Sequence, residues 1–344
     1  MLQLKNNSPF EAQIALFPDQ NGIDTLYTTV KATFTLGEKI EVAEKQSPIV
    51  VADEYRGDPL QTSLKYASEV HLTKPSTDIV MIGDACAPGK RPVSQLDVSL
   101  SVAGQKKTVR VMGDRRWDSG LLGLKMTPPL PFTSMPLIYE KAYGGSHEVD
   151  KEKQIKLFEA RNPIGIGFKG KRKSKELKGM SLPNLENPVK LIAKPDDRPT
   201  PACFSFISSS WQPRVSFVGT YDEAWTKKRA PYLAEDFDSR FFHTVYPDQV
   251  SKKYLKGGEP VFIQGMSPDG VLQFPLPLCE IEASVQIAGK KENPPLNLET
   301  VLFEPDDSRF SLLFRSATTC DKKALKVEQV DINLNNLQLN GGRA

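Results

Sequence analysis

The chain has 344 residues, of which 39% are hydrophobic and 25% charged, proportions typical of a soluble globular protein with its own core. Its formal net charge of +3 is small for this length, so composition does not indicate a nucleic-acid or membrane partner. No apolar run approaches the roughly 20 residues that span a bilayer, and the N-terminal residues lack the apolar stretch of a signal peptide. We therefore expect a cytoplasmic protein.

The four cysteines lie far apart in the sequence and form no CxxC pair; they are Cys86, Cys203, Cys279 and Cys320. We expect them to be reduced and mostly buried. The three histidines show no HExxH or Cys/His spacing, so we expect neither a metal nor another cofactor.

Alternation of apolar and polar residues is the dominant pattern along the chain. The segment from Leu26 to Leu36 places its apolar residues on one face, as a half-buried strand does, and a turn leads into 40–42. Residues 96–102 and 108–112 flank Ala103-Gly104-Gln105 and predict a hairpin. Strands are also expected at 261–263 and 271–274, on the two sides of a turn at 267–270. Further strands are expected at 279–287, 298–303, 310–314 and 327–334.

Helical signals are few and short. Thr220 with Glu223 matches a capping box and predicts a helix over Tyr221–Arg229. Pro247–Lys256 is followed by Gly257 and predicts a second helix, and Val149–Glu159 is a less regular candidate. The sequence thus predicts a mainly β protein, an antiparallel β-sandwich or barrel-like architecture with few short helices.

Composition changes along the chain suggest four regions. Residues 1–127 form an N-terminal β-rich region, and residues 128–213 form a long irregular central segment rich in Pro and Gly. Residues 214–334 form a C-terminal β-rich region, and residues 335–344 are expected to be a frayed polar tail.

Aromatic residues are unusually dense between Trp211 and Trp225. Arg214 lies in this segment, and we expect it to pair with Asp222 or to stack on Trp211. Two interpretations have equal weight: an aromatic anchor set for a protein partner, or a structural cluster in the core. The partner-binding candidates in this segment are Trp211, Arg214, Tyr221, Asp222 and Trp225.

Two glycine-containing motifs add the candidates Tyr143 and Arg161. Tyr143 precedes Gly144-Gly145, where a partner backbone could approach closely, although a tight turn is the commoner role. Arg161 precedes Asn-Pro; the sequence lacks the Gly-Lys-Ser/Thr ending of a phosphate loop, and an arginine anchoring carbonyls beneath the turn is favoured. The basic run 169–178 is interpreted as a solvated loop, with binding of phosphates or of an acidic partner surface as the alternative.

The order of several short sequence blocks resembles a bacterial family of domains linked to type VI secretion. The resemblance extends from about Lys5 to Pro277. The matching blocks are NNSPF, VKATF, DEYRGDP, KPSTDIVMIGDACAPGK, GDRRW, YEKAYGG, RNPIGIGF, LPNLE, WQPRVSFVGTYDEAW and AEDFDSRF.

This resemblance implies a non-enzymatic cytoplasmic adaptor or chaperone in a bacterium. The implied partners are a secreted toxin effector, bound through a PAAR-like region, and the VgrG spike protein. No catalytic residue is expected. The pentapeptide repeats of some relatives are absent from this sequence. The alternative is a carbohydrate-active or carbohydrate-binding β-sandwich protein, in which Asp236 and Asp238 would act as paired carboxyls.

Overall fold

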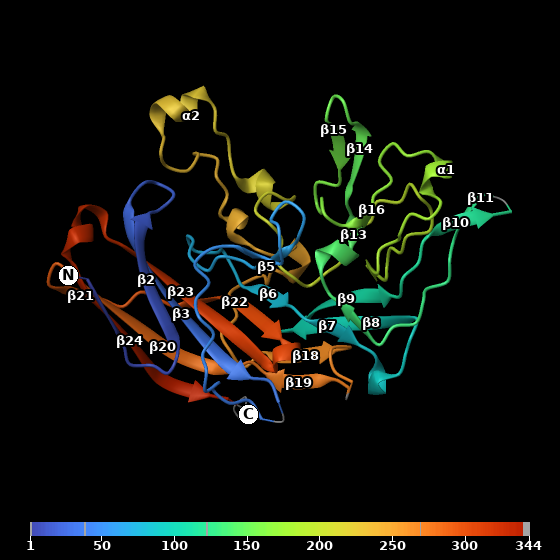
Figure 1. Cartoon of the computed structure of the whole chain (residues 1–344). Coiled ribbons are helices and arrows are strands. Elements are labelled where there is room, and N and C mark those ends of the chain that lie inside the picture. The colour runs from blue at the N-terminus through green and yellow to red at the C-terminus, as the bar shows by residue number, and fades with distance from the viewer. Residues whose placement is uncertain (1, 38, 122, 269, 340–344) are drawn as a thin grey trace.

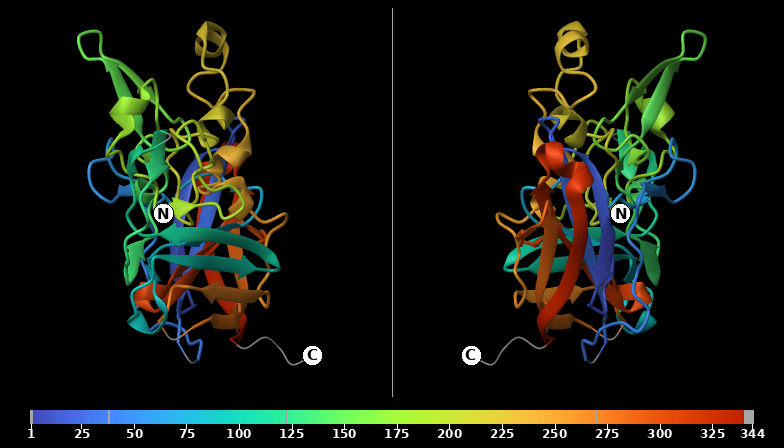
Figure 2. Two further views of the ribbon diagram at one scale, coloured as in Figure 1. Left: turned by 90° about the vertical axis from the view of Figure 1, so that its right-hand side faces the viewer. Right: turned by 90° about the vertical axis from the view of Figure 1, so that its left-hand side faces the viewer.

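Three β-sheets enclose the main hydrophobic core of the protein (Figures 1 and 2). The computed structural model describes residues 2–37, 39–121, 123–268 and 270–339. The first sheet has the order β2-β3-β23-β22-β6, with β6 parallel to β22 and all other neighbours antiparallel. Its strands are β2 (Glu11–Pro18), β3 (Asp24–Thr35), β23 (Arg309–Thr319), β22 (Asn297–Glu304) and β6 (Asp78–Met81).

The second sheet packs against the first and has the order β1-β24-β20-β21. Its strands are β1 (Gln3–Asn6), β24 (Val327–Gln338), β20 (Leu278–Ile287) and β21 (Lys290–Glu292). Val330 and Ile332 of β24 belong to the same core cluster as Leu26 and Val30 of β3. The two sheets therefore form the layers of a sandwich.

The third sheet has the order β17-β9-β8-β18-β19, and in Figure 2 (left) its strands cross one end of the other two sheets. Its strands are β17 (Leu185–Glu186), β9 (Gln105–Met112), β8 (Gln95–Val102), β18 (Pro260–Gln264) and β19 (Leu272–Pro275). The predicted hairpin of β8 and β9 is confirmed, with Ala103 and Gly104 both at positive φ in its two-residue turn. The predicted turn at 267–270 includes residue 269, which lies outside the described residues.

The remaining elements are short. Two-stranded pairs are β4 (Glu54–Tyr55) with β5 (Leu64–Tyr66), β7 (Asp84–Cys86) with β12 (Ser134–Pro136), β10 (Trp117–Gly120) with β11 (Gly123–Met126), β13 (Tyr143–Gly144) with β16 (Ile166–Gly167), and β14 (Ser146–Asp150) with β15 (Ile155–Phe158). The α-helices are α1 (Ser174–Leu177) and α2 (Glu223–Lys228). The 3-10 helices are η1 (Pro88–Lys90), η2 (Tyr139–Lys141), η3 (Arg214–Phe217), η4 (Ser239–Phe242), η5 (Pro247–Gln249), η6 (Pro305–Asp307) and η7 (Asp321–Lys326).

The predicted fold class, a mainly β protein with few short helices, is confirmed, and the sandwich is the architecture that the layers form. The strand patterns at 96–102, 279–287, 298–303, 310–314 and 327–334 all fall within strands. At 40–42 the structure has one bridge, between Val42 and Phe34, in place of a strand. The four cysteines are free, and three of them are buried.

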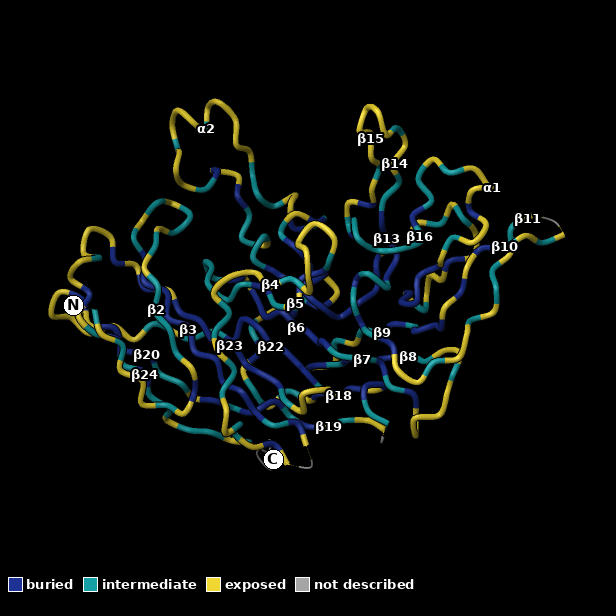
Figure 3. The backbone as a smooth tube through the Cα atoms, in the orientation of Figure 1, coloured by how far each residue is buried: buried dark blue, intermediate teal, exposed yellow. Residues whose placement is uncertain are grey.

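Strand β3 is buried on both faces, whereas its alternating pattern predicts burial on one. Its apolar face enters the core, and its polar face lies beneath the segment 43–78. Lys31 donates to the carbonyl oxygen of Pro48 at 3.0 Å, and Gln46 bonds to both backbone groups of Thr33. A chain segment with little regular structure therefore covers the polar face of the first sheet, as the dark central strands in Figure 3 show.

Two predicted helices are wrong and one is shorter than predicted. Residues 149–159 contain the end of β14 and the whole of β15, a hairpin that projects from the molecule (Figure 1). Residues 247–256 contain only the single turn η5. Helix α2 is confirmed, but Asp222 caps it by accepting from the Trp225 N–H at 2.8 Å, while the Thr220 side chain bonds to Asp236.

The sequence-defined regions share sheets and core. β1 pairs with β24 and β3 pairs with β23, near the other end of the chain. Leu137, Phe204 and Trp211 of the irregular segment belong to the main core cluster. β24 continues through Gln338, so residues 335–338 of the predicted polar tail belong to a strand. Residues 340–344 lie outside the described residues.

Candidate functional site

Asn162 joins two of the glycine motifs into one structure. Its side chain is fully buried, and its Nδ2 donates to the carbonyl oxygens of Tyr139 at 2.8 Å and Tyr143 at 3.0 Å. Its own carbonyl oxygen accepts from the Gly145 N–H at 2.8 Å. The YEKAYGG and RNPIGIGF blocks are thus held together by buried hydrogen bonds, and β13 pairs in parallel with β16 beside them.

The glycines of these motifs are required because two stretches of backbone touch. A Cβ on Gly144 would lie 2.1 Å from the Asn162 carbonyl oxygen, and one on Gly165 would lie 2.3 Å from the Asn162 Nδ2. Neither position has room for a methyl group. The tight-turn interpretation of Gly144-Gly145 therefore understates their role: they allow one chain segment to lie directly on another.

A buried ion pair connects the GDRRW block with the LPNLE block. Arg115 donates to the carboxylate of Glu186, and Glu186 also accepts from the Ile192 N–H at 2.7 Å. Burial raises the pKa of Glu186, while Arg115 acts against that shift. Asn184 donates both to the carbonyl oxygen of Met112 and to the carboxylate of Asp114. These contacts fix the two blocks side by side.

These four blocks converge on one surface groove. Its larger part has a volume of about 790 Å³ and its smaller part about 280 Å³, and the two parts share Ile166 and Ser181 in their walls. The groove walls from the four blocks are Asp114, Arg115 and Arg116; Glu140, Lys141, Gly144 and Gly145; Gly165, Ile166, Gly167 and Phe168; and Leu182 and Asn184. Figure 1 shows β13 and β16 beside β9 of the third sheet.

Charged groups in the larger part of the groove differ in how they are engaged. Glu140 accepts from the N–H and hydroxyl of Ser63, both at 2.7 Å, and Asp114 accepts from Asn184 at 2.9 Å. Among the described residues, the side chains of Arg116 and Lys141 form no hydrogen bond or ion pair. The groove therefore presents two cations without a protein counter-ion.

The basic run 169–178 forms one rim of the smaller part of the groove. Arg172 donates to the carbonyl oxygens of Phe168 at 3.0 Å and Ser146 at 3.3 Å, and Lys169 pairs with Asp196 at 2.6 Å. The remaining lysines of the run are exposed and form no ion pair with the described residues; they are Lys171, Lys173, Lys175 and Lys178. The run is thus partly anchored and partly solvated.

The structure separates the aromatic candidates into two groups. Trp211 is 5% exposed and packs edge-on against Tyr139, with ring centroids 5.5 Å apart. Arg214 is buried and donates to the carbonyl oxygens of Ile207 at 2.7 Å and Phe241 at 3.1 Å. Its guanidinium lies over the Phe241 ring, so its predicted contacts with Asp222 and Trp211 are wrong. Trp211 and Arg214 belong to the interior.

Tyr221, Asp222 and Trp225 lie together on the projecting lobe around α2 (Figures 1 and 3). Tyr221 is 43% exposed and meets Trp225 edge-on at 4.8 Å, while the Trp225 indole donates to the Tyr232 carbonyl oxygen at 2.8 Å. Part of this aromatic surface faces solvent. These three residues stay partner-binding predictions.

Tyr143 and Arg161 both lie in the motifs that build the groove, but neither side chain lines it. Tyr143 of β13 is 2% exposed, and its ring belongs to a buried cluster with Trp117 and Leu182. Arg161 forms a two-point ion pair with Glu159, at 2.7 and 2.9 Å, in place of the predicted carbonyl contacts. Although burial raises the pKa of Glu159, its bonds with Arg161 hold the pKa below the ordinary value.

Sequence reasoning missed Asn162, Arg116 and Lys141 as residues of the site. The signal for Asn162 was its position in an Asn-Pro pair between two glycine motifs, and a buried asparagine bonded to carbonyls is a common device in such turns. Arg116 and Lys141 carry no distinguishing local signal, because the absence of a counter-ion depends on the tertiary arrangement.

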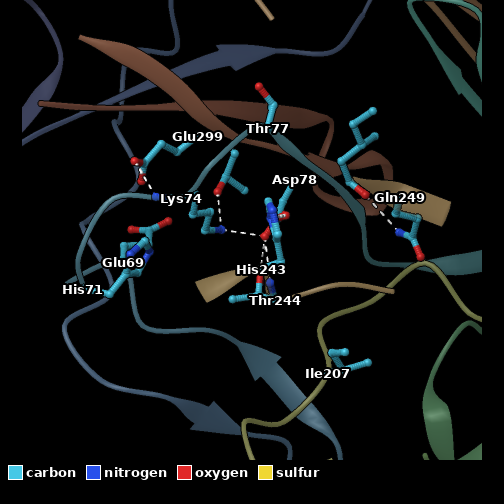
Figure 4. A network of polar contacts seen from close by, with 12 residues as sticks. Glu69, His71, Lys74, Thr77, Asp78, Ile207, His243, Thr244, Gln249 and Glu299 are labelled. Atoms are coloured by element: carbon cyan, nitrogen blue, oxygen red, sulfur yellow. Dashed lines mark hydrogen bonds and ion pairs between the residues drawn. The ribbon is translucent and has the colours of Figure 1, made fainter. Parts of the chain in front are cut away.

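A second cluster of ionisable groups joins the segment 43–78 to the first sheet and to His243 (Figure 4). Lys74 pairs with Asp78 at 2.6 Å, and Asp78 also bonds to His243 at 2.6 Å and to Thr244. Burial raises the pKa of Asp78, but Lys74 and His243 outweigh it and lower the pKa overall. Asp78 and Lys74 are both almost completely buried, and each neutralises the charge of the other. We interpret this buried ion pair as structural.

Glu299 and Arg315 continue this cluster across the first sheet. Arg315 donates to Glu299 at 3.1 Å and to the carbonyl oxygen of His71 at 2.7 Å, and Glu299 accepts from the Lys74 N–H at 2.8 Å. Burial raises the pKa of Glu299 to about 7, with Arg315 and Lys74 acting in the opposite direction. The cluster ties the residues around His71 and Lys74 to strands β22 and β23.

The two carboxyls of the carbohydrate-active alternative serve separate local turns. Asp236 accepts from the N–H and hydroxyl of Thr220, both at 2.8 Å. Asp238 caps η4 and pairs with Arg240 at 2.6 Å.

Among the described residues, no helix is long and apolar enough to cross a membrane.

Comparison with known proteins gives one match. A family described as "Uncharacterized protein conserved in bacteria (DUF2169)" matches residues 21–315. Neither a curated protein nor a solved structure matches the chain. The matched range covers most of the chain and contains all four blocks of the groove, and the protein therefore belongs to this bacterial family, DUF2169.

Proposed function

We propose that this protein is a non-enzymatic adaptor or chaperone that binds a secreted effector of a type VI secretion system and helps to load it onto the VgrG spike. The sequence blocks that resemble this group of domains supply the biological context. The observation that carries the proposal is that four of these blocks meet at one open groove.

The groove has the properties of a binding surface. Its walls are fixed by the buried contacts of Asn162 and by the Arg115–Glu186 pair, so little ordering entropy is lost when a partner binds. It offers apolar side chains such as Ile166 and the exposed Leu130, half-buried backbone at Gly165 and Gly167, and two cations that have no counter-ion among the described residues. A protein segment can use all of these groups at once. The effector would enter here through its PAAR-like region, and VgrG would meet another surface.

The test is co-purification and secretion in the bacterium that encodes the protein. The tagged chain should co-purify with an effector, and deletion of its gene should lower both the soluble yield and the secretion of that effector. Complementation with the intact gene is the control. If the effector is equally soluble and equally secreted without this protein, the proposed function is wrong.

A further inference from the structure

The unpaired cations of the groove indicate the chemistry of the segment that binds there. Arg116 is exposed and Lys141 half-buried, both line the larger part of the groove, and neither has a counter-ion among the described residues. The acidic side chains beside them, Glu140 and Asp114, are already engaged by Ser63 and Asn184. A ligand carboxylate can therefore pair with Arg116 and Lys141 without breaking an ion pair among the described residues.

Positive charge continues along the groove. Lys171, Lys173 and Lys175 lie in the run that forms the rim of the smaller part, where Arg172 and Glu176 line the wall. Glu176 accepts from the Lys173 N–H at 2.7 Å and is the sole acidic residue of the run 169–178. The rim of the smaller part is thus basic, although the whole chain carries a net charge of only +3.

The form of the groove favours an extended chain. Its two parts follow one another through the shared walls of Ile166 and Ser181. On one side β16 pairs with β13, whose other edge is bridged to the third sheet between Ala142 and Leu185. The second edge of β16 pairs with no described strand, so its peptide groups can pair with an incoming strand.

We infer that the groove binds an extended acidic segment of the partner protein, with carboxylates at Arg116 and Lys141 and apolar residues against Ile166 and the exposed Leu130. This inference rests on the proposed function and names the partner's chemistry. Nucleic acid fits the groove less well, because stacking of bases needs exposed aromatic rings. The one aromatic residue that lines the groove, Phe168, is 9% exposed.

The direct test uses a fluorescent peptide of about ten residues with alternating Glu and Leu, a length and pattern suited to one strand. Its Gln-for-Glu counterpart and an oligothymidylate of similar charge are the comparison probes. We expect the acidic peptide to bind, and binding to weaken as salt rises from about 0.05 to about 0.3 M. The other two probes should bind at least about tenfold more weakly.

The variant that tests the residues is the double charge reversal Arg116→Glu with Lys141→Glu. Neither side chain has a bonding partner to lose among the described residues, so the melting temperature should change little. Affinity for the acidic peptide should fall about tenfold or more. Lys322→Glu with Lys323→Glu in η7 is the matched control, since both residues are exposed and the change in net charge is identical. The control should bind like the wild type.

Three results would overturn the inference: equal binding of the Gln peptide, tighter binding of the oligonucleotide, or equal loss in both double variants. Absence of peptide binding would overturn it as well. Effector co-purification separates this inference from the proposed function. If the wild type captures an effector and the Arg116/Lys141 variant captures it equally well, the groove inference fails while the adaptor function stands. If the wild type captures none, the adaptor function fails.

Discussion

Asn162 donates its side-chain amide to the carbonyl oxygen of Tyr139 at 2.8 Å, although the two residues are 23 positions apart and both are fully buried. The same amide nitrogen also bonds to the Tyr143 carbonyl oxygen. One side chain thereby satisfies two main-chain groups that have no access to water. The Asn162 side chain thus helps to fix the position of the two segments that form the groove wall.

Replacing Asn162 with alanine should destabilise the protein and disturb the groove. The change leaves the carbonyl oxygens of Tyr139 and Tyr143 without this donor, and a buried unsatisfied group costs about 1–3 kcal/mol. Urea denaturation should show a decrease of that size or larger in the free energy of unfolding. Asn7→Ala, an exposed asparagine bonded to Asn333, is the control and should change it by less than about 0.5 kcal/mol. Equal effects of the two changes would refute the role of Asn162.

Gly165→Ala tests the contact between the two backbones. The added methyl group would lie 2.3 Å from the Asn162 Nδ2 and 2.5 Å from the Ala142 carbonyl oxygen, so the chain must shift. We expect a loss of about 1–3 kcal/mol in the free energy of unfolding, together with weaker effector binding. Gly37→Ala is the matched control because its nearest neighbour is 3.9 Å away. A neutral Gly165→Ala variant would show that the two segments need not touch.

Trp211→Ala should act on stability and leave any direct contact with a partner unchanged. A large aromatic side chain buried to this extent stabilises the fold by about 3–5 kcal/mol relative to alanine. Thermal unfolding should show a large fall in melting temperature, with a smaller one for Trp211→Phe. Trp225→Ala on the α2 lobe is the comparison and should cost far less stability. A Trp211→Ala protein that melts like the wild type but loses the effector would restore the anchor interpretation.

The buried Asp78 should make the protein sensitive to acid. Its folded-state pKa lies below the ordinary value of about 3.9, so the unfolded chain binds the proton more tightly. The stability due to Asp78 is therefore complete above that value and is lost as the pH falls through it toward the folded-state pKa. The free energy of unfolding, measured by urea at a series of pH values below about 5, should fall steeply.

Asp78→Asn identifies the group responsible. This variant should be less stable at neutral pH by about 3–5 kcal/mol, because Lys74 loses its buried counter-ion. Its stability should also depend less on pH in the acid range. Glu299, with a pKa of about 7, affects stability in a separate window between its ordinary value of 4.5 and about 7, so the two contributions can be resolved. An unchanged acid slope in Asp78→Asn would assign the slope to other carboxyls.

Local patterns in the sequence predict most of the strands but not the site. Alternation predicts β8, β9, β20 and β22 because each has a face against the core. The helix predicted for residues 149–159 is wrong, because Val149 and Ile155 lie on the two strands of an exposed hairpin. The cap of α2 was misplaced because Thr220 and Asp222 both suit that position, and the Asp236 contact that occupies Thr220 comes from 16 residues away.

The sequence identifies the blocks that form the candidate site, but it does not predict which of their side chains line the groove. Tyr143 and Arg161 identify the right blocks, but Tyr143 packs inward and Arg161 pairs with Glu159, while other residues of those blocks form the groove wall. Trp211 and Trp225 are near neighbours in sequence, yet one is in the core and the other on a projecting lobe. Composition cannot distinguish these environments, because aromatic residues favour both.

The pairing of strands from opposite ends of the chain has a consequence for synthesis on the ribosome. β3 lies between β2, made just before it, and β23, whose Thr319 pairs with Thr25. At about 5–20 residues per second, β23 leaves the ribosome tens of seconds after β3. During that interval the apolar face of β3, with Leu26, Val30 and Phe34, lacks the strands that complete its layer. The nascent chain therefore has to keep this apolar face from aggregating until β23 has been made.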